Sequence, residues 1–330
     1  MYSGIWFSHF THPFSLISLF SVFLSQGDVP FTTQKIEYRK LGYGPPIPLA
    51  PHDVLQLNKS KPFTTSRKVV LLTTTNAAFI DFTDNWLASI RRIGPLPFTT
   101  IVAEDDIAYD HLLNISDVNA IRAGTNSPTT FLMYGTDEYK KMVGKRTRYI
   151  LEYLSNGYDV IFNDVDSVWL QDPFPYLDTK YDVCAQPVRY LLSKYICAGF
   201  TYYKSANKTI QLVKKWIEIM TQSNYTLKEN VLLNKIIDER MVKNLTVKHL
   251  DANKFFSGLY YFDDNWRRTH TELDPVMIHN TFVKGHDIKV DRFKRLGLWY
   301  INYTIPEKPN VHQEIGSIIL YSYNELSGIL

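Results

Sequence analysis

Three strand-like runs, separated by segments of helical periodicity, constrain the fold of this 330-residue chain most strongly. The runs are 68–72, 98–103 and 159–162, and their apolar and β-branched residues are typical of strands buried on both faces. Gly94-Pro95 and Gly157 end the two intervening segments, as expected at helix C-termini. Strands that alternate with helices form a doubly wound sheet with right-handed crossovers. The sequence therefore predicts a Rossmann-like α/β fold.

Polar residues follow each of the three predicted strands directly. Thr74 and Asn76 follow the first strand, Asp105 follows the second, and Asp164 and Asp166 follow the third. Ligands of doubly wound sheets bind at the carboxyl ends of the strands. We therefore expect these side chains to converge on one site.

The third polar cluster carries two aspartates in an Asp-x-Asp arrangement. In an extended chain Asp164 and Asp166 lie on the same face, within ~7 Å of each other. Facing carboxylates repel unless a cation lies between them, and such oxygen-rich sites suit Mg²⁺ or Mn²⁺ shared with substrate phosphates. For the tripeptide alone, the more common explanation is a solvated strand end before the turn at 172–173.

The second half of the chain alternates further strands and helices, and no Pro/Gly-rich linker divides residues 67–330. We interpret this region as one catalytic domain whose second half wraps around the first. The net charge of +3 and the absence of a basic run predict no nucleic-acid partner.

The N-terminal residues differ in character from the rest. Between Ile5 and Leu24 there is no Asp, Glu, Lys or Arg, and about 20 such residues can span a bilayer. The nearest basic residues, Lys35 and Arg39, follow the segment, so a cleaved signal peptide competes with a membrane anchor. Residues 1–27 are therefore predicted as a signal peptide or signal-anchor. Residues 28–66, with a proline-rich run at 45–48, are predicted as a stem.

Six Asn-x-Ser/Thr sequons favour entry into the secretory pathway, and each predicts an asparagine at the surface: Asn58, Asn114, Asn207, Asn224, Asn244 and Asn302. The chain has two cysteines, Cys184 and Cys197. In an oxidising lumen we expect them to form a disulfide, whereas in the cytosol they would be buried thiols.

Segment 157–173, which reads GYDVIFNDVDSVWLQDP, resembles the metal-binding segment of glycosyltransferase family 77, the nucleotide-diphospho-sugar transferases. The resemblance extends in order over most of 67–330, through Ala103-Glu104-Asp105, Lys145, 197–200 and 276–289. It implies a GT-A fold with an Asp-x-Asp motif, a retaining reaction, and a place in the secretory pathway, with the Golgi as the expected compartment.

The resemblance also implies roles for single residues. Asp164, Asp166 and His279 would bind Mn²⁺ or Mg²⁺, with His286 as the competing third ligand. The nucleotide diphosphate of a UDP-sugar donor would be bound by residues from several segments, namely Thr74, Asn76, Asp105, Lys145, Gly285 and Lys289.

One departure from the family concerns the sugar pocket. The family has an Asp-Gln pair followed by x-x-Leu-Asn, where this chain has Glu229-Asn230 followed by 231–234. Acid and amide are retained, but their side-chain lengths change. We expect Glu229 and Asn230 to be catalytic. Glu229 could attack as a nucleophile or stabilise positive charge on the sugar, and the sequence does not separate these roles.

Three functions follow from these observations. The first is transfer of a sugar, with xylose from UDP-xylose as the expected case, onto a glycan acceptor such as fucose; galactose and arabinose are the alternatives within the family. The second is a non-catalytic protein that binds nucleotide sugars. The third is a metal-dependent phosphohydrolase, which would need further acidic ligands.

Overall fold

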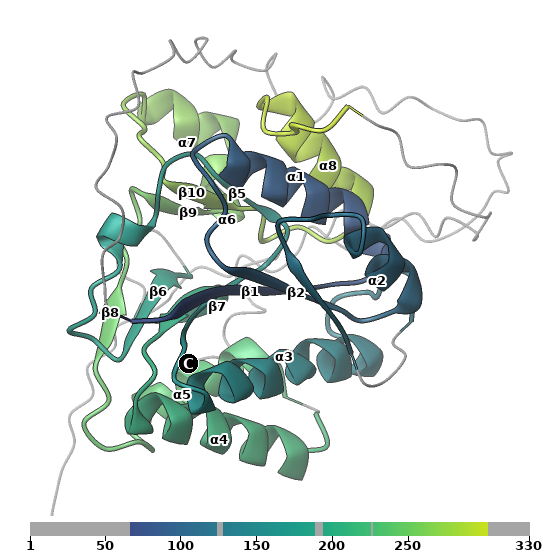
Figure 1. Cartoon of the computed structure of the whole chain (residues 1–330). Helices are drawn as coiled ribbons and strands as arrows, with labels where there is room; N and C mark the ends of the chain where they lie inside the picture. Colours follow the sequence, from purple (N-terminus) through teal and green to yellow (C-terminus); the bar gives the residue numbers. More distant parts are fainter. Residues whose placement is uncertain (1–66, 124–127, 189–193, 226, 303–330) are drawn as a thin grey trace, which may run out of the picture. The chain divides into compact units, whose positions relative to one another are not determined.

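The structure is a computed structural model that describes residues 67–123, 128–188, 194–225 and 227–302 (Figure 1). The predicted signal peptide or anchor at 1–27 and the predicted stem at 28–66 lie outside these residues. No helix of the described ranges is long and apolar enough to cross a membrane.

A seven-stranded mixed sheet forms the centre of the described domain, in the order β3-β2-β1-β4-β7-β6-β8. Strands β1 to β4 pair in parallel, whereas β7 is antiparallel to both β4 and β6, and β8 is parallel to β6. The predicted α/β architecture is therefore confirmed. The strands are β1 (Val69–Thr75), β2 (Thr99–Ala103), β3 (Asn119–Arg122), β4 (Asp159–Asn163), β6 (Val183–Pro187), β7 (Ile196–Tyr203) and β8 (Val247–His249).

A second, three-stranded sheet brings distant segments together. Strand β10 (Met277–His279) pairs in parallel with β9 (Phe255–Ser257) and antiparallel with β5 (Ser167–Trp169). In this register His279 lies opposite Ser167, the residue that follows Asp166. The pairing therefore carries His279 to the aspartates.

Helices cover both faces of the large sheet (Figure 1). One face carries α3 (Asp137–Ser155), α4 (Asn207–Gln222) and α5 (Glu229–Asp238), and the other carries α1 (Ile80–Arg91) and the small sheet. The remaining helices are α2 (Asp106–Leu112), α6 (Gly258–Tyr261), α7 (Asp264–Thr269) and α8 (His286–Arg295), with 3₁₀ turns η2 (Ala77–Phe79) and η3 (Phe174–Tyr176).

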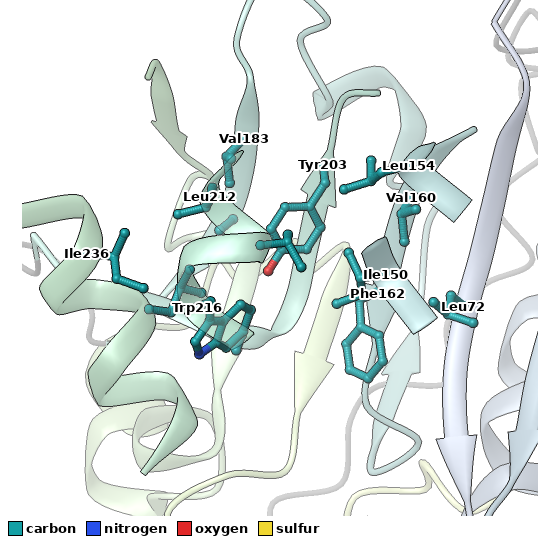
Figure 2. Close-up of a cluster of buried hydrophobic side chains, with 14 of the residues drawn as sticks. Leu72, Ile150, Leu154, Val160, Phe162, Val183, Tyr203, Leu212, Trp216 and Ile236 are labelled. Atoms are coloured by element: carbon teal, nitrogen blue, oxygen red, sulfur yellow. The ribbon is translucent and has the colours of Figure 1, made fainter. Parts of the chain in front are cut away.

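Alternate residues of the central strands supply the cores on the two faces. Val160 and Phe162 of β4 belong to the core under α3, α4 and α5, whereas Ile161 belongs to the core on the opposite face (Figure 2). Trp216 of α4 is fully buried, and its indole Nε1 donates to the Glu229 carbonyl oxygen at 3.0 Å. This bond fixes the start of α5, where the predicted catalytic acid lies.

The predicted disulfide is wrong, because both cysteines are free. Cys184 on β6 lies opposite Tyr202 on β7, five residues along that strand from Cys197. At the rise of a β-strand this separates the two cysteines by roughly 17 Å, beyond the reach of a disulfide. The surface expectation is confirmed for the five sequon asparagines that the structure describes, which are all exposed: Asn114, Asn207, Asn224, Asn244 and Asn302.

Candidate active site

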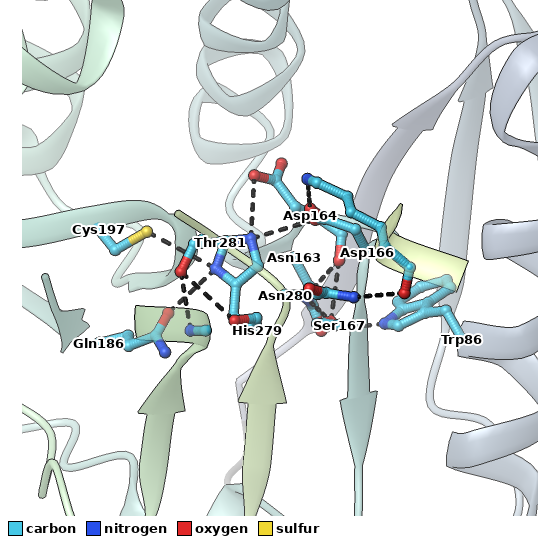
Figure 3. Close-up of polar contacts among 12 residues, drawn as sticks. Trp86, Asn163, Asp164, Asp166, Ser167, Gln186, Cys197, His279, Asn280 and Thr281 are labelled. Carbon is cyan, nitrogen blue, oxygen red and sulfur yellow. Dashed lines mark hydrogen bonds and ion pairs between the residues drawn. The ribbon is translucent and has the colours of Figure 1, made fainter. Parts of the chain in front are cut away.

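The two aspartates lie where β4, β7 and β10 meet (Figure 3). The backbone N–H of Asp164 donates to the Gly199 carbonyl oxygen of β7 at 2.8 Å, and the N–H of Asn280 donates to the Asp166 carbonyl oxygen at 2.9 Å. Main-chain bonds from two other strands thus hold the Asp-x-Asp segment. Both aspartates are oriented by the sheets rather than by a flexible loop.

Asp164, Asp166 and His279 form a cluster whose ligand atoms all lie within 4.8 Å of one another. The His279 Nε2 atom is 3.1 Å from Asp166 Oδ1 and 3.6 Å from Asp164 Oδ2. Two carboxylates and an imidazole are a donor set that Mn²⁺ accepts, and Mg²⁺ favours the carboxylate oxygens. The residues present therefore fit a divalent cation.

Gly199 is required by this geometry. A Cβ atom at this position would lie 2.3 Å from His279 Cε1 and 2.4 Å from Asp164 Oδ2. Any larger residue at position 199 would displace the side chains of Asp164 and His279. Only glycine therefore lets the β7 backbone pack against the cluster.

Neighbouring charges shift the pKa values of His279 and Asp166. Burial alone would lower the pKa of His279, but Asp166 and Cys197 together outweigh burial and raise the pKa to about 10. Burial would raise the pKa of Asp166, but Lys289 and His279 together lower it below its usual range. Lys289 of α8 forms an ion pair with Asp166 Oδ2. The carboxylate is ionised, and a metal bound by His279 must displace the Nε2 proton.

Arg146 of α3 connects the cluster to Glu229. Its guanidinium Nη1 is 2.9 Å from Asp164 Oδ1, and its Nη2 is 2.7 Å from Glu229 Oε1. The Arg146 side chain is only 6% exposed. The sequence predicts a nucleotide-binding role for the neighbouring residue, Lys145, and does not identify Arg146. In the structure Lys145 forms an ion pair with Glu104 at 3.0 Å. The signal that could have identified Arg146 is its place on the buried face of α3, one turn before Ile150.

Glu229 is the first residue of α5 and is buried. Burial raises the pKa of its carboxyl group, although Arg146 opposes the shift. Among the residues that the structure describes, its Oε2 atom is buried without a hydrogen-bond partner. Asn230 accepts a hydrogen bond at Oδ1 from the Ala198 N–H at 2.7 Å, which ties α5 to β7. Glu229 therefore keeps one carboxylate oxygen without a hydrogen bond and is connected to Asp164 through Arg146, whereas Asn230 has a structural contact.

The residues predicted to bind the nucleotide lie at several strand and helix ends. Asp105 caps α2 by accepting from the Ala108 N–H at 2.8 Å, and it also accepts from the Ala77 N–H at 2.7 Å. Asn76 Nδ2 donates to the carbonyl oxygens of Pro128 and Thr130. Their roles with nucleotide stay predictions, as do those of three further residues: Thr74 at the end of β1, Lys145, and Gly285, which caps α8 with a φ of +104°.

His286, the competing third ligand, lies elsewhere. Its Nε2 atom is 2.8 Å from Asp81 Oδ2, and its Nδ1 atom is 2.9 Å from Asp287 Oδ1. Both ring nitrogens of His286 therefore already contact carboxylates, one on α1 and one on α8. Of the two histidines, His279 is the one that completes the cluster.

Comparisons with known proteins show the family of this chain. Residues 95–293 match the family model of nucleotide-diphospho-sugar transferases. A UDP-D-xylose:L-fucose alpha-1,3-D-xylosyltransferase of Arabidopsis thaliana is 26% identical in an alignment of 280 positions that covers 77% of this chain and 75% of that protein. A UDP-galactose:fucoside alpha-3-galactosyltransferase of Dictyostelium discoideum is 28% identical in an alignment of 197 positions that covers 51% of this chain and 29% of that protein.

Among solved structures, the apo form of the glycosyltransferase GlyE of Streptococcus pneumoniae TIGR4 aligns with a TM-score of 0.47 and 12% identity, covering 71% of this chain and 61% of that chain. The mixed sheet with an Asp-x-Asp segment after β4 is the GT-A arrangement expected from the sequence. The chain belongs to the nucleotide-diphospho-sugar transferase family and is a glycosyltransferase.

Proposed function

We propose that this protein transfers xylose from UDP-xylose to a fucose-containing glycan, with retention of anomeric configuration and with help from a divalent cation. The observation that carries the proposal is the continuous chain of contacts from the cluster Asp164, Asp166 and His279 through Arg146 to Glu229. A cation bound by this cluster, together with the donor diphosphate, would lie close to a buried acid. The cation can stabilise the leaving diphosphate, and the acid can stabilise positive charge on the transferred sugar.

Departure of the diphosphate is the first requirement of the reaction. When bound, Mn²⁺ or Mg²⁺ supplies a Lewis acid that stabilises the charge of the leaving UDP. Asp164, Asp166 and His279 would hold this cation. Lys289, which already contacts Asp166, lies within reach of the same charge and can exchange that partner for a phosphate oxygen.

The reacting sugar needs stabilisation of positive charge at its anomeric carbon. Glu229 Oε1 is engaged by Arg146, which leaves the buried Oε2 to face the sugar. The ion pair draws negative charge away from the carboxylate as a whole, which supports an electrostatic role for Glu229 over nucleophilic attack. In same-face transfer, the bond from the anomeric carbon to phosphate breaks with its electron pair going to UDP. The acceptor oxygen bonds to the same face, and its proton goes to the leaving phosphate.

The proposed donor rests on relatives. Four xylosyltransferases of Arabidopsis thaliana that act on L-fucose are 26–27% identical and align with 75–77% of this chain. Relatives that transfer galactose or arabinose make UDP-galactose and UDP-arabinose the alternative donors. A second candidate is a non-catalytic protein that binds nucleotide sugars. It is supported by Glu229-Asn230, where this chain departs from the acid and amide of the family.

We further propose that the protein works in the lumen of the secretory pathway, with the Golgi as its compartment. The exposed sequon asparagines support this location, because N-glycosylation requires accessible sites in a lumen. The protein from cells would then lose apparent mass on enzymatic deglycosylation. An unchanged mass would contradict the proposal.

A donor screen tests the proposed function. The full chain with Mn²⁺ and a fucosylated acceptor is assayed for UDP release from UDP-xylose, UDP-galactose and UDP-arabinose, and the product anomer is read by NMR. We expect turnover with UDP-xylose and a retained α-linkage. Asp166→Asn should abolish turnover, whereas Asp110→Asn, at an exposed position of α2, should not change it. Saturable UDP binding without turnover would favour the non-catalytic candidate.

A further inference from the structure

Gln186 on β6 is fully buried beside the cluster of Asp164, Asp166 and His279 (Figure 3). The sequence around Gln186 does not indicate a functional role. Its amide Nε2 donates to the carbonyl oxygen of Phe256 at 2.7 Å and to that of Phe255 at 3.3 Å. Both carbonyls belong to β9, the strand that pairs with β10. Because the nitrogen is held by two acceptors, the amide cannot flip, and its oxygen must point the other way.

The oxygen of this fixed amide faces the imidazole of His279. Gln186 Oε1 lies 3.1 Å from His279 Nδ1. An amide oxygen can only accept a hydrogen bond, so His279 must donate from Nδ1. The opposite nitrogen, Nε2, is the one that faces Asp164 and Asp166. Its lone pair is therefore the one available to a cation.

Cys197 is the only other side chain with a described contact to the same nitrogen. Its Sγ atom lies 3.7 Å from His279 Nδ1, and sulfur is a weak acceptor. Gln186 therefore provides the shorter and stronger contact.

We propose that Gln186 is a positioning residue for the catalytic cation: by holding the Nδ1–H of His279, it fixes the ring orientation and the tautomer that present Nε2 to the metal. This inference rests on the proposed metal site. A fixed outer partner of this kind contributes to affinity because the ligand is aligned before the metal arrives.

Titration of the full chain with Mn²⁺ alone, by calorimetry, tests the proposal without any donor. Gln186→Met, which removes both amide functions, should weaken Mn²⁺ binding by roughly 10- to 100-fold. Gln186→Glu, which keeps an acceptor for Nδ1–H but as a carboxylate cannot donate to β9, should bind Mn²⁺ much more tightly than Gln186→Met. Gln222→Met, at an exposed position of α4, serves as the matched control for the substitution.

Three results would overturn the proposal. The first is Mn²⁺ binding by folded Gln186→Met that equals wild type. The second is a loss of binding by folded Gln186→Glu as large as that expected of Gln186→Met, because donation to β9 would then be the role of the amide. The third is weaker binding on Cys197→Ala but not on Gln186→Met, which would make the thiol the positioning partner.

A measurement on the wild-type protein remains decisive if the variants fail to fold. In ¹⁵N-histidine NMR of the Mg²⁺-loaded chain, with His279 assigned by its loss in His279→Gln, Nδ1 should carry a proton. A bare Nδ1 would overturn the proposal. Failure of the proposed xylosyl transfer would appear in the donor screen and would leave both the Mn²⁺ titration and the histidine spectrum unchanged, so the two failures are distinguishable.

Discussion

Arg146 contributes most to linking the parts of the site, because a single buried guanidinium neutralises one metal ligand and the buried acid of the sugar pocket. Removing one partner of a buried ion pair leaves an uncompensated charge, which costs about 3–5 kcal/mol. We therefore expect Arg146→Gln to lower the free energy of unfolding by about 3 kcal/mol and to reduce kcat. Chemical denaturation and steady-state kinetics measure the two effects.

Arg148 provides the control for this variant. It lies on the same helix but is exposed, so Arg148→Gln should change stability by less than about 0.5 kcal/mol. Equal stability and equal kcat for both variants would show that Arg146 does not couple the cluster to Glu229.

Motifs identified some residues of the site, and packing determined the others. Asp164, Asp166 and His279 were identified from the sequence, because their residue types follow strands and match a family pattern. Arg146 and Gln186 were missed because each makes its contact across the fold. Nothing in the neighbouring sequence of Arg146 indicates Glu229, which lies 83 residues further along the chain, and Gln186 reads as an ordinary strand residue.

The segment between β2 and α2 illustrates how an element can depend on one side chain. Asp105 was predicted to contact nucleotide, but both of its carboxylate oxygens accept backbone N–H bonds, one from α2 and one from η2. Loss of such a cap costs about 1–2 kcal/mol. Asp105→Ala should therefore lower the free energy of unfolding by about 2 kcal/mol, as measured by denaturant titration, because two bonds are lost.

Asp110→Ala, on the same helix at an exposed position, is the control and should be close to neutral. If Asp105→Ala instead keeps full stability and loses only affinity for UDP, then Asp105 does not stabilise the fold, and its predicted contact with nucleotide explains the residue.

Strand existence was easier to predict than strand pairing. The runs at β1, β2 and β4 were predicted because continuous apolar runs between helices are typical of a central parallel sheet. A short strand at 276–278 was predicted and corresponds to β10, but its pairing with β5 and β9 was not, since these partners are far apart in sequence. The disulfide prediction failed for the same reason. Both cysteines lie on strands, but their separation depends on the register of β6 with β7, which composition does not encode.

For the described domain as a whole, nucleotide and cation should stabilise the fold together. Both are expected to bind where β4, β7 and β10 meet, so each increases the affinity for the other. A ligand at 100 times its dissociation constant adds about 2.7 kcal/mol, which raises Tm by roughly 5–10 °C in a domain of this size. We expect this rise in thermal unfolding with UDP and Mn²⁺ together, and a much smaller one with UDP and EDTA. An equal rise in both conditions would mean that UDP binds without the metal.

In the proposed mechanism, Asp164, Asp166 and His279 bind a divalent cation that is shared with the diphosphate of the donor. Crystals of the full chain grown with Mn²⁺ and UDP, with diffraction data collected at the manganese absorption edge, test it most directly. We expect one anomalous peak within coordination distance of both aspartates, His279 Nε2 and the UDP phosphates, and no such peak in Asp166→Asn. Ordered UDP with no anomalous peak at these three side chains would contradict it.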